Sequence, residues 1–332
     1  MLYPLRFEPL FRRYLWGGRR LATVLDKPIG NNSCAESWEI VGHNQDQSAV
    51  AFGDLKGKKL NELIDTYGEQ LLGSSVLKRI HAPDVPEKLK GRFPLLFKFL
   101  DAHQNLSVQV HPDDAIGATL EPPDFGKTEA WYVMHAEAGS KIYAGLKNGV
   151  SDSDLRAAIN NGTTEELLNC IEPKPGDCIF IRAGTMHAIG AGLLIAEIQQ
   201  ASDTTYRVFD WNRVNKDGKP RELHIEESLK ATDFDLGPIQ PSIPQPTESA
   251  NATTLIANDK FVMRRWQMNS PIDFDDEKLH ILAVTKGSVH VTDDPCDQPL
   301  ATGNTMLIPA CQTQFKVTPN QPSEILDIVL PY

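Results

Sequence analysis

Short alternations of hydrophobic and polar residues dominate the chain and predict a mainly β protein. The pattern covers residues 93–110, 131–143, 174–230 and 254–332. Within 131–143, a turn at 137–139 separates two expected strands, because Glu-Ala-Gly interrupts the apolar pattern there. Many short strands separated by turns are typical of sandwich and barrel folds.

Helical periodicity is confined to a few segments of this pattern. Residues 58–72 place leucine and isoleucine at helical spacing and predict one helix. Residues 151–170 predict a helical insert, with Ser151 or Ser153 as the N-cap. A third helix is expected at 225–231. The helices are therefore additions to a β framework.

A proline-rich segment divides the chain. Residues 236–247 are rich in proline and lack periodicity, so we predict a linker at 236–250. We expect a larger β domain at 1–235 and a smaller one at 251–332. The smaller domain resembles a second copy of part of the larger one.

The evidence for this internal repeat is a shared spacing. Gly176 is followed after five residues by Arg-Ala-Gly and then by His187, and Gly303 is followed after five residues by Pro-Ala-Cys. The second copy has Gln312 and Gln314 where a histidine is expected. If the repeat is real, the smaller domain has lost its metal site; coincidence is the alternative.

Metal-ligand side chains recur at spacings that suit neighbouring strands. Gln109 and His111 are two residues apart, so on a strand they share one face. A metal held there needs partners from elsewhere, and Glu129 and His187 are the natural ones. Two histidines, one carboxylate and a weaker amide oxygen suit zinc with a position left for substrate.

Charge and composition narrow the function classes. The chain has 332 residues, a net charge of −11 and five cysteines. The acidic balance argues against a nucleic-acid or membrane partner. The odd number of scattered cysteines, with no signal-peptide pattern, predicts a reduced cytoplasmic protein. No obligate protein partner is implied.

Four motifs together resemble the type I mannose-6-phosphate isomerase family, in its short bacterial form. They are residues 93–102 (FPLLFKFLDA), 109–113 (QVHPD), 129–132 (EAWY) and 184–190 (GTMHAIG). The resemblance covers nearly the whole chain. It implies a cupin (jelly-roll) fold for the larger domain, which would be the catalytic one, and a cupin-like smaller domain without metal. It also implies zinc-dependent interconversion of mannose 6-phosphate and fructose 6-phosphate.

The resemblance also implies roles for individual residues. The expected zinc ligands are Gln109, His111, Glu129 and His187. Arg207 and Glu197 are expected in the catalytic site, and Ser107, Lys127 and Arg213 near the phosphate of the sugar. The segment 35–38, with Glu36 and Trp38, is expected near the pocket.

Several assignments have alternatives. Gln109 could hydrogen-bond within the pocket instead of binding metal, Lys127 could be a solvated loop residue, and Arg207 could pair with Asp203 or Asp210. The proton-transfer base is open among Glu197, a metal-bound water and a pocket histidine. A cupin dioxygenase and a non-catalytic sugar-binding protein remain rival functions.

Overall fold

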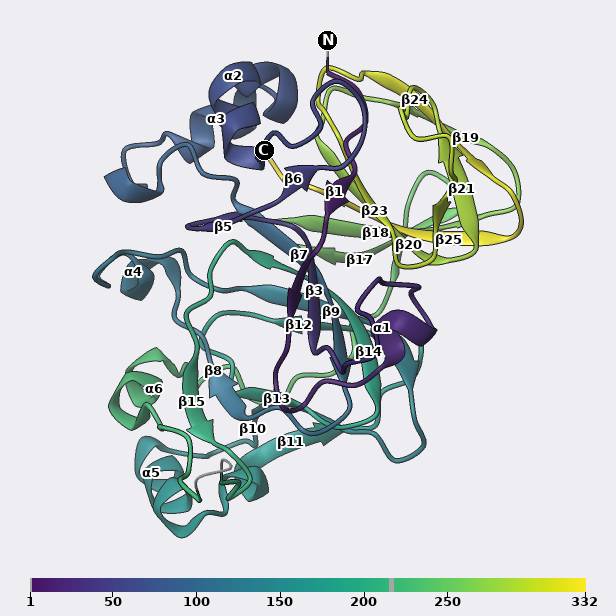
Figure 1. Ribbon diagram of the computed structural model, residues 1–332. Helices are drawn as coiled ribbons and strands as arrows, with labels where there is room; N and C mark the ends of the chain where they lie inside the picture. Colours follow the sequence, from purple (N-terminus) through teal and green to yellow (C-terminus); the bar gives the residue numbers. More distant parts are fainter. Residues whose placement is uncertain (1, 215–217) are drawn as a thin grey trace.

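The computed structural model describes residues 2–214 and 218–332 and shows a mainly β protein, as predicted. The strands form two pairs of larger antiparallel sheets (Figure 1). In the first pair, a six-stranded sheet has the order β12-β9-β14-β7-β3-β2 and a five-stranded sheet the order β11-β10-β13-β8-β15. The second pair has the orders β16-β17-β18-β25-β20-β23 and β19-β24-β21-β22.

The strands of the first pair are β2 (Leu10–Arg12), β3 (Glu36–Ile40), β7 (Leu95–Ala102), β8 (Val108–Val110), β9 (Glu129–Ala136), β10 (Ile142–Leu146), β11 (Leu168–Ile171), β12 (Cys178–Ile181), β13 (His187–Ile189), β14 (Leu193–Gln200) and β15 (Tyr206–Phe209). Those of the second pair are β16 (Gln245–Pro246), β17 (Ala252–Ala257), β18 (Val262–Met268), β19 (Ile272–Asp275), β20 (His280–Lys286), β21 (Ser288–Val291), β22 (Leu300–Ala301), β23 (Thr305–Ile308), β24 (Gln314–Pro319) and β25 (Ser323–Val329). Two small ribbons are β1 (Phe7–Glu8) with β6 (Ala49–Val50), and β4 (Gly42–His43) with β5 (Asp46–Gln47).

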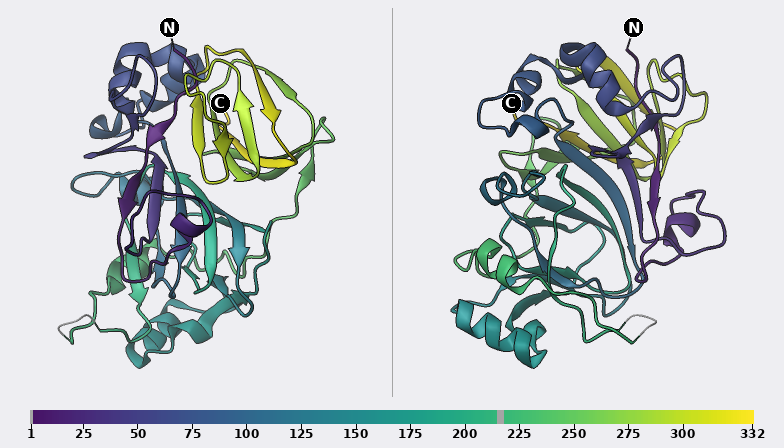
Figure 2. Two further views of the ribbon diagram at one scale, coloured as in Figure 1. Left: turned by 45° about the vertical axis from the view of Figure 1, so that its right-hand side comes forward. Right: turned by 60° about the vertical axis from the view of Figure 1, so that its left-hand side comes forward.

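Helices border these sheets. They are α1 (Arg20–Thr23), α2 (Leu60–Leu72), α3 (Ser74–Ile80), η1 (Glu87–Leu89), α4 (Asp114–Gly117), α5 (Asp152–Asn161), η2 (Thr164–Leu167) and α6 (Ile225–Ala231). In both views of Figure 2, α5 and α6 lie at the end of the molecule opposite the second sheet pair. Helices α2, α5 and α6 were predicted from periodicity; α3 was not.

The predicted helical insert ends earlier than expected. Helix α5 and the short η2 occupy residues 152–167, but residues 168–171 form β11. Leu168 and Ile171 are buried at the two ends of this strand, which pairs with β10. Tertiary pairing therefore overrides the helical reading of this apolar run, as is common for short segments.

The two sheet pairs have the same strand order. Read along the larger sheet, β12-β9-β14-β7-β3 corresponds to β23-β20-β25-β18-β17, and β11-β10-β13-β8 corresponds to β22-β21-β24-β19. Gly176 and Gly303 occupy equivalent turns before β12 and β23, both with positive φ. The faint repeat in the sequence thus coincides with a repeated topology.

The division into domains stays a proposal, and hydrogen bonds cross it in several places. In the expected linker, Ile239 N–H donates to Ala144 O at 3.1 Å, and Ser242 N–H donates to Cys178 O at 2.7 Å. Residues 245–246 already form β16. Near the N-terminus, Leu5 and Leu307 exchange two backbone hydrogen bonds of 2.8 and 2.9 Å.

One hydrophobic cluster joins both sheet pairs. It includes Leu5 and Phe97 from the first part of the chain and Phe261 and Leu326 from the last. Between the sheets of each pair lies a further cluster. No helix among residues 2–214 and 218–332 is long and apolar enough to span a membrane.

The second sheet pair buries a charged network. His280 lies between Asp276 and Asp327, with ring nitrogens 2.9 and 2.7 Å from their carboxylate oxygens. Phe274 and Phe315 stack beside it, with ring centroids 4.5 Å apart. Burial alone would lower the pKa of His280, but Asp327 and Asp276 outweigh it and raise the pKa to about 9.

This network predicts a pH-dependent stability. A histidine with a raised folded-state pKa stabilises fully below its unfolded value of about 6.5, and that contribution is lost as pH rises through about 9. We expect the free energy of unfolding of the wild type to exceed that of His280→Gln by on the order of 3 kcal/mol at pH 6, and the gap to shrink by pH 10. Urea unfolding at both pH values measures this. A pH-independent gap would contradict the assignment.

Candidate metal centre and active site

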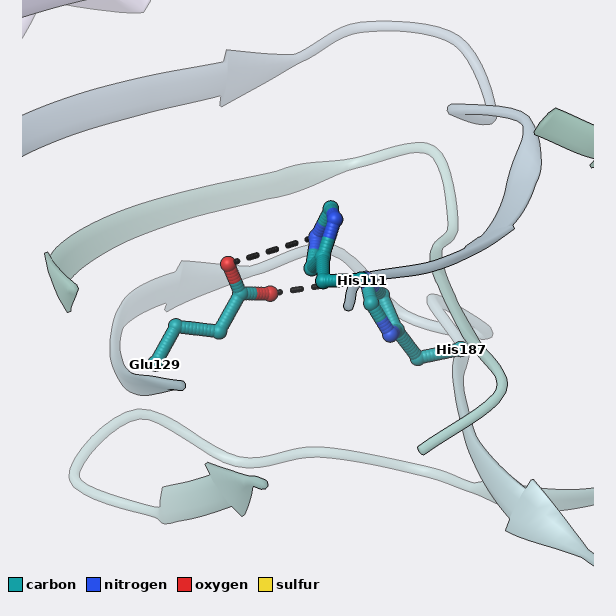
Figure 3. A group of neighbouring side chains, drawn as sticks. All are labelled: His111, Glu129 and His187. Atoms are coloured by element: carbon teal, nitrogen blue, oxygen red, sulfur yellow. Dashed lines mark ion pairs between the residues drawn. The ribbon is translucent and has the colours of Figure 1, made fainter. Parts of the chain in front are cut away.

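Three ligand-type side chains converge inside the first sheet pair (Figure 3). His111 follows β8, Glu129 begins β9 and His187 begins β13. The exposed fraction of each is at most 1%. Their ligand atoms lie within 4.8 Å of one another, and they form the one such group of three or more found in the described residues. The site draws on both sheets of the pair.

Local backbone features hold the two histidines. The turn at 182–185 contains Gly184, whose φ of +86° favours glycine. Gly184 N–H donates to His111 O at 2.9 Å, so this turn connects the segments that carry both rings. His187 pairs with Gln109 in the register between β13 and β8.

Hydrogen bonds orient both imidazole rings. His111 Nδ1 lies 3.1 Å from Thr204 O, and His187 Nδ1 lies 2.8 Å from Thr185 O. A carbonyl oxygen only accepts, so each Nδ1 carries the proton and each Nε2 presents a lone pair when the ring is neutral. Burial is the main cause that lowers the pKa of His187 to about 3 and the pKa of His111 well below its usual value.

The two lone pairs face the Glu129 carboxylate. Glu129 Oε1 is 3.4 Å from His187 Nε2, and Glu129 Oε2 is 3.5 Å from His111 Nε2. Donor atoms about 2 Å from one tetrahedral zinc lie about 3.3 Å apart. His187 Nε2 is buried and has no hydrogen-bond partner in the part of the chain that the structure describes. The donor set therefore fits a divalent metal.

Lys127 brings a cationic side chain to this group. Its Nζ lies 2.8 Å from His111 Nε2 and forms a short ion pair with Glu129. Lys127 is 5% exposed. It thus lies beside the expected metal ligands and not in solvent, which excludes the reading as a solvated loop residue.

A cavity of about 310 Å³ opens beside the three ligands. It is lined by Tyr14, Trp16, Glu36, Lys98, Leu100, Leu106, Ser107, Gln109, Lys127, Glu129, Trp131, Ile189, Glu197, Asp203, Thr205, Arg207 and Arg221. This set includes Glu36 and every expected metal, catalytic and phosphate-site residue except His111, His187 and Arg213. Trp38 does not line the cavity, and its Nε1–H donates to Glu36 at 2.6 Å. The volume suits a small polar metabolite.

Arg213, unlike the expected substrate-binding residues Ser107 and Lys127, points away from the cavity. Its guanidinium donates to Asn105 O at 2.6 Å and to the backbone and carboxylate of Asp210. It does not line the cavity. Arg221, which the sequence analysis did not single out, lines it instead. Strand spacing could not reveal Arg221, because it lies in a loop beyond β15.

Strand register explains how Arg207 and Gln109 reach the cavity. Gln109 pairs with His187 on one side and with Arg207 on the other, so the three side chains share a face of the five-stranded sheet. Arg207 Nη1 donates to Glu222 O at 2.9 Å. Burial and the neighbouring Arg221 charge lower the pKa of Arg207. Among the described residues, Arg207 Nε has no hydrogen-bond partner.

The opposite wall carries a buried charged row. Glu197 pairs with Trp131 and Lys98 in the six-stranded sheet. Lys98 Nζ lies 3.1 Å from Glu197 and 3.5 Å from Glu36, and Trp131 Nε1–H donates to Glu197 at 2.9 Å. Burial and the Glu129 charge raise the pKa of Glu197. Lys98 lies within an apolar strand pattern, so the sequence did not single it out as a site residue.

Comparisons with known proteins identify the family that this chain resembles. Residues 5–125 match the catalytic domain of type I phosphomannose isomerase. Mannose-6-phosphate isomerase ManA of Bacillus subtilis is 35% identical over 323 residues, which cover 95% of each chain. Mannose-6-phosphate isomerase of Streptococcus mutans is 34% identical over 314 residues, 93% of each chain.

A solved structure shows the same architecture throughout. The mannose 6-phosphate isomerase from Bacillus subtilis superposes with a TM-score of 0.86 at 29% identity, covering 98% of this chain and 99% of that one. A mannose 6-phosphate isomerase bound with zinc and yttrium superposes with a TM-score of 0.75 at 18% identity, which shows a shared fold.

The donor geometry predicts metal binding directly. We expect chelated and dialysed protein to take up one divalent ion per chain, and His187→Ala to lose that uptake because one of three strong ligands is missing. Elemental analysis after zinc loading measures it. His135→Ala is the matched control, since His135 is exposed on β9 and remote from the ligand group. Equal zinc content in both variants would refute the site.

Proposed function

Because the chain belongs to the type I phosphomannose isomerase family, we propose that it interconverts mannose 6-phosphate and fructose 6-phosphate. The observation that carries this proposal is the buried group of His111, Glu129 and His187 beside a cavity lined by both cationic and carboxylate side chains. An aldose–ketose isomerisation moves one proton between C1 and C2 and one between the two oxygens. The cavity has room for such a metabolite.

We assign a zinc ion to this group, with Gln109 as a further ligand. Two imidazole nitrogens and a carboxylate form a usual zinc donor set, and Gln109 lies on the same sheet face as His187. When bound, the ion supplies Lewis-acid stabilisation of negative charge on sugar oxygens. Neutral His111 and His187, each held at Nδ1 by a carbonyl, are already in the tautomer that binds metal through Nε2.

Glu197 is our candidate for proton transfer at carbon. Its carboxylate lies in the cavity wall, and its raised pKa makes it a stronger base than an exposed glutamate. Trp131 and Lys98 fix its orientation by the contacts described above. Both pocket histidines have Nδ1 occupied and Nε2 facing Glu129, which disfavours them as the base.

Arg207 is positioned to stabilise the enediolate. It shares a sheet face with Gln109, and its buried Nε needs an acceptor. A guanidinium stays charged despite the lowered pKa, so it can offset charge that develops on the sugar oxygens. Ser107 also lines the cavity and offers a hydroxyl to the substrate.

The reducing cytoplasm fits this proposal. All five cysteines are free, and Cys170 and Cys311 are exposed. Free exposed thiols persist where disulfide formation is disfavoured.

The rival functions predict different results for oxygen consumption and for turnover. A cupin dioxygenase on iron also uses two histidines and a carboxylate, but it consumes oxygen. A sugar-binding protein without catalysis gives no turnover. A coupled assay with mannose 6-phosphate, run with an oxygen electrode before and after chelation, separates all three. Turnover that is lost on chelation and restored by zinc, without oxygen uptake, supports the proposal.

Substitution of Arg207 tests its role apart from metal binding. We expect Arg207→Lys to keep its zinc and to lose about 10²–10³ in kcat, because lysine keeps the charge but not the planar pair of donors. Elemental analysis and the coupled assay on the same sample measure both. An unchanged kcat would make Arg207 a structural residue.

A further inference from the structure

We propose that Arg221 binds the phosphate group of the substrate and that Asp210 is its positioning residue. This inference rests on the function proposed above and names the group that recognises one end of the substrate. It replaces Arg213, one of the three residues, with Ser107 and Lys127, that the family resemblance placed near the phosphate.

The two arginines differ in what their donors contact. Arg213 uses its guanidinium on Asp210 and on Asn105 O, and it lies outside the cavity lining. Arg221 lines the cavity together with Arg207. Only a donor that reaches the cavity can contact a ligand held there. Arg213 therefore holds Asp210 from outside the cavity and does not contact a ligand in it.

Asp210 holds Arg221 by one edge of its guanidinium. Arg221 Nε donates to Asp210 Oδ2 at 2.8 Å, and Nη2 donates to Oδ1. Two parallel hydrogen bonds fix the plane of the group. Within residues 2–214 and 218–332, Nη1 of Arg221 has no hydrogen-bond partner. With respect to these described residues, that edge has donors left for an anion.

Local charge favours an anion here. Arg207, Arg213 and Arg221 lie near two carboxylates, those of Asp210 and Glu222, so positive charge is in local excess in a chain of net charge −11. A phosphate monoester carries about −1.5 to −2 at neutral pH. A local excess of positive charge lets an acidic protein attract a sugar phosphate.

The other side of the cavity is unsuited to phosphate. Four carboxylates line it, those of Glu36, Glu129, Glu197 and Asp203. Lys98 and Lys127 are committed to three of them through ion pairs. A phosphate there would meet like charges. The sugar must therefore enter with its phosphate toward Arg221 and its reacting carbons toward Glu129.

The first test is a comparison of Michaelis constants. We expect Arg221→Met to raise KM for mannose 6-phosphate about 10- to 100-fold, since it removes charge-assisted hydrogen bonds. Arg221→Lys should give a smaller increase. Arg156→Met is the matched control: Arg156 also pairs with a carboxylate through two nitrogens, but it lies on α5 outside the cavity. An unchanged KM in Arg221→Met would overturn the inference.

A binding measurement separates this inference from the proposed function. Calorimetric titration of the zinc-loaded protein with inorganic phosphate needs no turnover. Phosphate affinity that falls in Arg221→Met and persists in Arg156→Met supports Arg221, even if mannose 6-phosphate proves not to be the substrate. Equal affinity in wild type and Arg221→Met overturns it, even if the isomerase activity is real. Equal thermal unfolding midpoints show that each variant is folded.

Discussion

Burial of the Glu129 carboxylate between two imidazole lone pairs is the constraint on which the site depends. Neither neutral ring can donate to the carboxylate, because each uses its one N–H on a backbone carbonyl. A buried anion facing two lone pairs costs free energy unless a cation compensates it. Lys127 supplies one such charge, and a divalent ion at the same place would supply more. The strands around the site fix this arrangement in place.

The charged side chains that line the cavity are unevenly distributed between its two ends. Carboxylates gather near Glu129, and guanidinium groups gather near Asp210. A substrate with an anionic tail and an uncharged carbonyl end fits such a distribution in one direction. Orientation is thereby built into the walls before any reacting group is in contact.

The sequence predicted which side chains would lie together where a motif also determines the position of a strand end. His111, Glu129 and His187 each stand in a motif at a strand end, and the structure brings them together. Lys98 could not be identified, because its significance arises only when the register of β7 and β14 sets it beside Glu197. Arg221 depended on a loop whose course no periodicity specifies.

Elements of the fold were likewise predictable where the signal is local and not where it depends on long-range pairing. Helix α6 appeared at its expected residues, since its spacing is local. Strand β11 was mistaken for helix, because its pairing with β10 is a long-range property. The repeat was faint in the sequence but clear in the strand order. Many different residues can form the same order of hydrogen-bonded strands, whereas a metal site needs particular residues at particular positions.

The same strand order shows which residues of the second sheet pair correspond to the expected metal-site region of the first. By register, His280 occupies the position of Glu129, Asp327 that of Glu197 and Arg264 that of Lys98. Charges remain in that row, but stacked phenylalanines fill the space beside it.

The pairing of Leu5 with Leu307 has a consequence for synthesis on the ribosome. Leu5 finds its backbone partner about three hundred residues later in the sequence, so the pair forms only after Leu307 has been made. Until then, apolar residues near the N-terminus lack the C-terminal part of their cluster. A nascent chain that has not reached Leu307 therefore exposes this apolar surface, and a chain terminated before Leu307 never covers it. Exposed apolar surface of this kind favours aggregation and chaperone binding.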